Sequence, residues 1–480
     1  MSKKSSAPDL TRRQFIGSSC CAAVGATGLL SALGSLRLIG AAASPGNGPQ
    51  TPNRSASIAS DYKALVCLFL NGGNDANNMI VPADTAGYAA YAAARSNLAL
   101  PQTGLLPISP KTSDGRAWAL HAALPEIQSL FGSGKAALLA NVGTLAYPTT
   151  KDQFRANSVP LPFQLFSHAD QQVEWQTSVP DRLVNTGWGG RLADLLNAFN
   201  SNNQISMSIS LSGTNRFQVG ANVTQYAVTT NGAVPLTNSS VTIGNNFLRA
   251  QSQKDIFAQA QPGLLDAAFG NVSDRAVKNA DYLNGVLGIS AAIPLTPGGT
   301  PTVSDQLKMI TRLITASSAL GLKRQIFFVQ LLGWDTHAAQ LSSAAPNTGA
   351  HASLLAQISA GIGSFYADMT TLGIADQVTL FTASDFGRTL RSNGDGSDHG
   401  WGNHQIVVGG AVKGGDIYGK MPTLVVDGPD DTSQGRWIPT TSVDEYAATL
   451  ATWFGVSATD LPTVLPNIGR FAKPNLGFLA

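Results

Sequence analysis

The chain has 480 residues, 43% of them hydrophobic and only 12% charged, which is the composition of a globular protein and not of a disordered one. Its formal charge of +2 arises in the first 43 residues, beyond which 26 basic and 28 acidic residues remain. No basic stripe interleaved with aromatic residues appears, so we exclude nucleic acid as a partner.

The first 43 residues have the features of an export signal. Arg12 and Arg13 precede "QFIG" and the apolar run "AAVGATGLLSALGSLRLIGAAA", which ends in small residues. Paired arginines followed by Phe15 are typical of a twin-arginine leader, whose export machinery carries folded proteins. A membrane anchor is the alternative, but Arg37 and the many small residues make a poor span. We expect cleavage, no stable membrane span afterwards, and a periplasmic or extracellular protein.

Residues 44–61, "SPGNGPQTPNRSASIASD", predict a flexible linker, and residues 62–480 the α/β domain. Beyond the leader only Cys67 remains, so no intrachain disulfide is possible in the exported chain.

Short apolar runs separated by helical patterns predict the central sheet. The run "YKALVCLFLNGG" at 62–73 is typical of a buried parallel strand that ends in glycines. Helical patterns lie between several such runs, and this alternation predicts an α/β fold with a mostly parallel central sheet and helices on both faces. Further strands are predicted at 135–145, 204–213, 324–334, 376–387 and 404–412, and helices at 188–200, 304–321, 349–373 and 443–455.

Residues 213–245 differ from this pattern. They are rich in Thr, Asn, Val and Gln and carry almost no charge, with "TTNGAV" as a plausible turn. We predict a small β-rich insertion here, followed by helices from 243 to 290.

Polar residues that can bind metal follow three of the predicted strands. Ligands of open α/β sheets bind outside the carboxyl ends of the strands, so these residues are expected to meet at one edge. The first strand runs into "NGGNDANNM", which places Asp75 after a Gly-Gly turn. Helix capping or an Asx turn is the alternative role for Asp75.

The strand at 324–334 runs into "GWDTH", which offers Asp335 and His337 as a carboxylate and an imidazole ligand for zinc or manganese. The strand at 376–387 ends at Asp385, and His399 lies in "DHG" before the next strand. The stretch between them is predicted to be a loop whose two ends reach the same sheet edge. Asp395 and Asp398 are expected to form turns, and His121 and His351 to be structural.

These motifs together resemble the family described as domain of unknown function 1501. The resemblance rests on the twin-arginine leader and on "NGGND", "FSHADQQ", "GWDTH", "SDFGRT" and "DHGWGNH…VVGGAVKGG", over residues 62 to 425. This family is similar to the alkaline phosphatase and sulfatase superfamily, so an alkaline-phosphatase-like fold with one or two divalent metal ions is implied, zinc or manganese being expected. The resemblance implies that the metal ligands are Asp75, Asp335, His337, Asp385 and His399.

Two departures from the superfamily affect the ligand set. Only one residue separates Asp335 from His337, where the superfamily commonly has three, and Phe386 stands where a histidine commonly follows the later aspartate. His168 or His404 is therefore a possible additional ligand.

The nucleophile is left open by the sequence. Ser167 in "FSHADQQ" precedes a plausible helix, where it is either a metal-activated nucleophile or an N-cap. Arg388 is predicted either to hold an anionic substrate in bidentate fashion or to pair with a neighbouring carboxylate. We expect an exported metal-dependent hydrolase of small phosphate or sulfate esters that uses metal-activated water or a serine. The alternative is a non-catalytic exported metal-binding or envelope-assembly protein.

Overall fold

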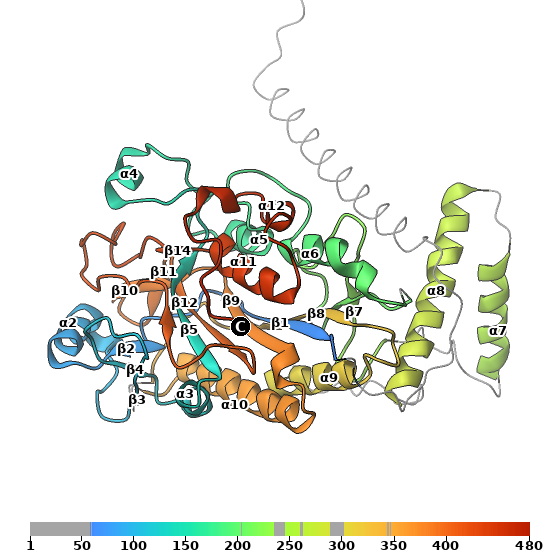
Figure 1. The fold of residues 1–480 in the computed structure, drawn as a ribbon, viewed down its shortest axis with the longest axis horizontal. Coiled ribbons are helices and arrows are strands. Elements are labelled where there is room, and N and C mark those ends of the chain that lie inside the picture. The colour runs from blue at the N-terminus through green and yellow to red at the C-terminus, as the bar shows by residue number, and fades with distance from the viewer. Residues whose placement is uncertain are drawn as a thin grey trace, which may run out of the picture. The chain divides into compact units, whose positions relative to one another are not determined.

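The computed structural model describes residue 58 and the ranges 60–202, 204–234, 245–259, 263–288, 302–342, 345 and 347–480 (Figure 1). The predicted leader at 1–43 and nearly all of the linker at 44–61 lie outside the described residues, so both stay predictions. Within the described residues, no helix is both long enough and apolar enough to cross a bilayer.

Two compact units make up the chain. The larger comprises Gly46–Pro235 and Asn279–Ala480, and the smaller comprises Met1–Pro45 and Leu236–Lys278. In the smaller unit, the described residues form helix α7 (Asn245–Ala258) and the first part of helix α8 (Leu264–Leu287). These are the helices that were predicted after the insertion.

The larger unit is built on a central sheet that contains nine strands within the described residues. Eight of them follow the order β13-β5-β12-β9-β1-β8-β6-β7, and β14 also pairs with β5. All neighbours pair in parallel except those of β12. The prediction of a mostly parallel α/β sheet is confirmed. The bounds are β1 Lys63–Leu70, β5 Ala136–Gly143, β6 Ser208–Ser210, β7 Tyr226–Ala227, β8 Arg324–Leu331, β9 Val378–Ser384, β12 Asn403–Gly409, β13 Ile417–Tyr418 and β14 Thr441–Ser442.

The three central strands end at the same edge of the sheet. In β1, every residue from Ala64 to Leu70 is buried, as expected for a strand covered on both faces. Its last residue, Leu70, pairs with Leu331 of β8 and with Ser384 of β9. The segments that follow β1, β8 and β9 therefore leave the sheet side by side.

Strand β12 runs opposite to its neighbours β5 and β9. Its first residue, Asn403, pairs with Val142 near the end of β5. Because of this reversal, the residues before β12 reach the edge at which the parallel strands end. Before β12, strands β10 (Arg388–Ser392) and β11 (Ser397–His399) pair in a two-stranded antiparallel sheet, where the sequence predicted a loop.

Helices cover both faces of the sheet (Figure 1). The helices lie in two layers, one on each face of the sheet. The first comprises α3 (Pro125–Gly132), α9 (Val303–Thr315) and α10 (Ala350–Thr371), and the second α5 (His168–Thr177), α6 (Trp188–Leu196), α11 (Val443–Phe454) and α12 (Leu461–Val464).

Capping residues explain where two of the predicted helices begin. The side chain of Thr302 accepts from the backbone N–H of Asp305 at the start of α9, and Ser442 accepts from Glu445 at the start of α11. Both are complete capping boxes, which satisfy otherwise unpaired backbone donors.

The remaining elements lie around this core. A three-stranded antiparallel sheet follows β1, with β2 (Ile80–Pro82), β3 (Leu106–Ile108) and β4 (Trp118–Leu120). Helix α2 (Thr85–Arg95) contacts β2 of this small sheet, and helix α4 (Lys151–Ala156) follows β5 in the chain. The predicted insertion contributes β7, which adds to the parallel sheet, and a turn in which Thr229 and Gly232 exchange backbone hydrogen bonds. Residues 235–244 of the insertion lie outside the described residues.

Gly72 allows two of the loops at this edge to touch. Its φ is +120°, and a Cβ built on it would lie 2.4 Å from the backbone nitrogen of Asp335. Gly72→Ala is expected to lower the free energy of unfolding by about 2–5 kcal/mol, from backbone strain and overpacking combined. Urea unfolding measures this. Gly373→Ala is the matched control, because Gly373 also has a positive φ, +70°, but open space around it. Equal losses in both variants would contradict a role for the close approach.

The buried carboxyl group of Glu174 is expected to make the free energy of unfolding depend on pH. Burial raises its pKa from 4.5 to about 8. Above pH 4.5 the unfolded chain ionises while the folded chain keeps the proton, so stability falls as the pH rises towards 8, by at most about 1.4 kcal/mol per pH unit. Glu174→Gln is expected to flatten this slope and to be more stable than the wild type at pH 8. Denaturant unfolding at pH 5 and pH 8 measures the difference, and an unchanged slope would contradict it.

Candidate metal centre

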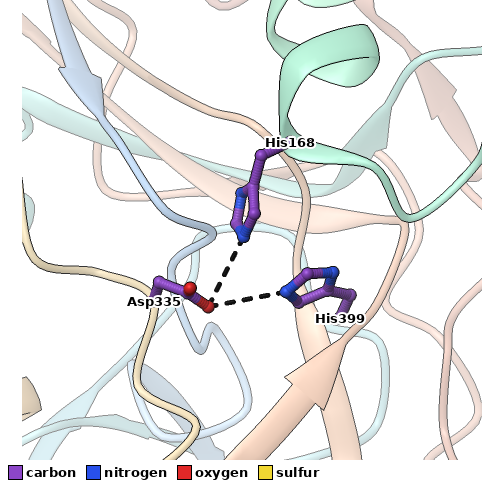
Figure 2. Close-up of side chains that lie close together, drawn as sticks. All are labelled: His168, Asp335 and His399. Carbon is purple, nitrogen blue, oxygen red and sulfur yellow. Dashed lines mark ion pairs between the residues drawn. The ribbon is translucent and has the colours of Figure 1, made fainter.

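Asp335 is the centre of a cluster of histidines at the sheet edge. It follows β8, and its Oδ1 lies 3.4 Å from Nε2 of His168, 3.3 Å from Nε2 of His337 and 3.5 Å from Nε2 of His399. Figure 2 shows how Asp335, His168 and His399 converge from three different segments of the chain. The Asp335 side chain is 46% exposed, so the cluster is open to solvent on one side.

His168 is the first residue of α5 and is held from behind by a carboxylate. Its Nδ1 lies 2.7 Å from Oδ2 of Asp385, and this hydrogen bond raises the pKa of His168. In the neutral ring, the Nδ1 proton is donated to Asp385 and Nε2 keeps its lone pair. Nε2 is buried and has no hydrogen-bond partner within the described chain. An imidazole oriented by a carboxylate in this way is a common arrangement for metal ligands.

His399 ends β11 and is oriented by a backbone carbonyl. Its Nδ1 lies 2.6 Å from the oxygen of Phe166, a residue held at a φ of +72°. This contact places the proton on Nδ1 and leaves the Nε2 lone pair directed at Asp335. Burial lowers the pKa of His399, which favours the neutral imidazole that binds metal.

His337 completes the set of three imidazoles. Its Nδ1 lies 3.2 Å from Oδ1 of Asp398, and its Nε2 lies 2.8 Å from Nε2 of His399. Nδ1 of each ring faces an oxygen acceptor, so both rings are expected to carry the proton there. Two lone pairs then face each other at this short distance, and a cation or a shared proton between them would offset their repulsion.

The distances from Asp335 to the three imidazoles fit a divalent cation, whereas the 2.8 Å between Nε2 of His337 and Nε2 of His399 is shorter than tetrahedral geometry gives. Zinc bonds of about 2.0–2.1 Å in tetrahedral geometry place two ligand atoms about 3.3–3.4 Å apart. The three distances from Oδ1 of Asp335 lie between 3.3 and 3.5 Å. His168, Asp335 and His399 also form a group whose ligand atoms all lie within 4.8 Å of one another.

Arg388 lies behind Asp335 and is itself buried. It donates to Oδ1 of Asp335 and to the backbone oxygens of Gly72, Gly73 and Ser397. Burial alone would raise the pKa of Asp335, but the hydrogen bond from Arg388 and its charge lower it overall. Of the two roles that the sequence left open, the contacts favour pairing with a carboxylate. All three guanidinium nitrogens of Arg388 already donate to groups of the chain.

Asp385 supports the cluster rather than joining it. Its Oδ1 accepts from the backbone N–H of Gly72 at 3.1 Å, and its Oδ2 accepts from His168 and from Gln172, each at 2.7 Å. Both oxygens are thus engaged by protein donors.

Asp75 and His404, two further ligand candidates, lie in other surroundings. Asp75 forms a fully buried ion pair with Arg95. Nδ1 of His404 accepts from the backbone N–H of Asn141 at 2.9 Å, and burial lowers the pKa of His404 to about 4. Neither belongs to the group formed by His168, Asp335 and His399.

Ser167 occupies the N-cap position of α5 but does not cap it. Its hydroxyl donates to Oδ2 of Asp170 at 2.6 Å, and its side chain accepts no backbone hydrogen bond from the first turn.

Phe386 packs against the two imidazoles that flank Asp335. Its ring centroid lies 4.6 Å from that of His168 and 4.7 Å from that of His399. A Cβ on Gly73 would come within 2.7 Å of this ring, so Gly73 leaves the room that Phe386 fills. The residue that departs from the superfamily pattern therefore forms one wall of the cluster.

Three groups that hold the side chains of the cluster in place were not identified from the sequence. They are Asp398 behind His337, Gln172 behind Asp385 and the carbonyl of Phe166 behind His399. Only Asp398 had a signal, its position next to His399. The other two depend on the path of the loop before α5, which the sequence does not reveal.

Comparisons with solved structures find distant likenesses. The PsFucS1 sulfatase from a Pseudoalteromonas species is 12% identical, with 84% of this chain and 69% of that one covered at a TM-score of 0.35. Ps i-CgsB is also 12% identical, covering 84% and 77% at 0.36. The lipoteichoic acid synthase LtaP from Listeria monocytogenes is 8% identical, covering 86% and 78% at 0.34. TM-scores this low give the likenesses no weight for function.

No curated protein matches the chain. A family model does match, over residues 62–441 and hence over most of the chain. The resemblance inferred from the motifs is confirmed at the level of the family. The chain belongs to the family described as protein of unknown function DUF1501.

Proposed function

We propose that the protein is a metal-dependent hydrolase of small phosphate or sulfate esters. The observation that carries this proposal is the convergence of three imidazole Nε2 atoms on the Asp335 carboxylate, with a hydrogen-bond acceptor facing Nδ1 of each ring. The proposed ligands are His168, Asp335, His337 and His399. Three nitrogen ligands and one oxygen ligand favour zinc over manganese, which prefers oxygen.

A divalent cation held by these residues would polarise an ester oxygen and lower the pKa of water near neutral pH. The residues of the chain provide the orientation. Asp385 and the Phe166 carbonyl fix the planes of His168 and His399, while Arg388 keeps Asp335 ionised and in place. The exposed side of Asp335 leaves room for a substrate to approach.

We propose water rather than Ser167 as the attacking group. Ser167 directs its hydroxyl proton at Asp170, and none of its hydrogen bonds within the described structure joins it to His168, Asp335 or His399. A carboxylate that accepts the proton of a serine hydroxyl can also activate that serine as a nucleophile. The choice between water and Ser167 is therefore tested directly.

The N-terminal leader indicates the cellular location of the protein. We propose export by the twin-arginine machinery to the periplasm or beyond, on the sequence of residues 1–43 alone. The competing function is a non-catalytic exported metal-binding or envelope-assembly protein. One observation favours this competing function. The buried guanidinium of Arg388 donates to Asp335 and to backbone oxygens, and therefore does not bind an anionic substrate.

Loss of a proposed ligand is expected to remove both metal and turnover. Wild-type protein should gain thermal stability on adding Zn²⁺, by about 2.7 kcal/mol when the free metal is 100-fold above its Kd. Asp335→Asn and His399→Gln should lose this gain and lose turnover of aryl phosphates and sulfates. Thermal unfolding with and without Zn²⁺, elemental analysis and a chromogenic assay measure the three effects.

Asp395→Ala is the matched control, because Asp395 is an exposed carboxylate on the same hairpin. It should keep both metal and turnover. Tight stoichiometric metal without turnover in the wild type would favour the binding protein, and wild-type turnover that survives in Asp335→Asn would contradict the proposed centre.

Ser167→Ala separates the two nucleophiles. If water attacks, the variant should keep most of the wild-type kcat, because the residues that orient the cluster are unchanged. Steady-state kinetics on the same aryl esters measure this. A fall of kcat to background, with metal content and folding intact, would make Ser167 the nucleophile.

A further inference from the structure

Asp75 is engaged by two protein donors in the interior. Its Oδ2 accepts hydrogen bonds from the guanidinium of Arg95 and from Nε2 of Gln340. Asp75, Arg95 and Gln340 are all fully buried. The negative charge of the carboxylate is therefore offset by a fixed cation of the chain itself, which is the condition under which a buried charge is tolerated.

Arg95 is held in place by groups from several segments. It lies at the end of α2, and its Nε donates to Oδ1 of Asn78 at 3.1 Å. Its Nη1 donates to the backbone oxygens of Thr389 and Leu390 at 3.0 and 3.1 Å. The ion pair thus ties the loop after β1 to strand β10, which leads into the hairpin that carries His399.

Gln340 connects this ion pair to the proposed metal ligands. Its Oε1 accepts from the hydroxyl of Ser397 at 2.7 Å and from that of Thr336 at 3.2 Å. Thr336 lies between Asp335 and His337, and Ser397 lies two residues before His399. One buried amide therefore bridges Asp75 to both of the segments that supply these ligands.

We infer that Asp75 is a positioning residue of a centre that holds one ion, with Arg95 as its permanent counter-charge and Gln340 as its link to the ligands. This inference rests on the proposed metal centre. Within the described residues, His168, Asp335 and His399 form a group whose ligand atoms all lie within 4.8 Å of one another, and Nε2 of His337 lies 3.3 Å from Asp335 and 2.8 Å from His399. Asp75 is outside that group, and its Oδ2 accepts hydrogen bonds from both Arg95 and Gln340.

Metal stoichiometry tests the first half of the inference. Wild-type protein saturated with Zn²⁺ and freed of excess metal should contain one ion per chain by elemental analysis. Asp75→Asn should still contain one ion. Two ions in the wild type and one in Asp75→Asn would make Asp75 a ligand and overturn the inference.

Gln340→Met tests the second half while keeping both charges of the Asp75–Arg95 ion pair, in case Asp75→Asn fails to fold. The variant should keep one ion but bind it about 10–100-fold more weakly, as when other outer-shell partners of metal ligands are removed. Titration with Co²⁺ gives the Kd, and the visible absorption of bound Co²⁺ reports any change in coordination geometry. A purely structural effect would lower stability without changing that spectrum.

Gln325→Met is the matched control. Gln325 is also a buried glutamine that accepts from one side chain, Tyr62, but it lies near the opposite end of β8. Its Kd and Co²⁺ spectrum should equal those of the wild type. An unchanged Kd in Gln340→Met, with metal bound by the wild type, overturns this inference alone. A wild type that binds no Zn²⁺ or Co²⁺ overturns the proposed centre as well.

Discussion

The contact between Arg388 and Asp335 is the interaction on which the rest of the site depends. Asp335 follows β8 at the edge of the sheet, where a carboxylate can turn towards solvent. Here a buried guanidinium holds it against three imidazole rings and, through backbone oxygens, joins it to the loop after β1 and to the hairpin before β12. Arg388 therefore fixes the position of the Asp335 carboxylate, which the three imidazoles face, and does not bind substrate.

Much of the fold could be predicted from the sequence because the central strands are unambiguous. Runs such as "KALVCLFL" and "RQIFFVQL" are buried along nearly their whole length, and two helices, one between these strands and one after the last strand, have clear start signals. The short strands β2, β3 and β4 were missed because three residues carry no periodicity. The pairing of β10 with β11 was missed because its turn, "NGDG", is also typical of an irregular loop.

The site was harder to predict because strand direction and ion pairs are not local properties. The rule that ligands gather beyond strand ends placed Asp335, His337, Asp385 and His399 at one edge, and the structure brings them there. It could not separate direct contact from support, since Asp385 and Asp75 also follow glycine-rich or strand-end segments. What distinguishes them is the partner each one meets, His168 for the first, from 217 residues away in the chain, and Arg95 for the second, from the end of the next helix.

The reversal of β12 has a consequence for the order of folding. His168, Asp335 and His399 come together only after the sheet has assembled from both halves of the chain, with β12 inserted between β5 and β9. Contacts of such long sequence separation form late and slowly. Until they form, the nascent polypeptide has no preorganised site for an ion, so the proposed centre would take up metal only after the sheet is complete, and a chain that lacks its last third would lack Asp335, His337 and His399.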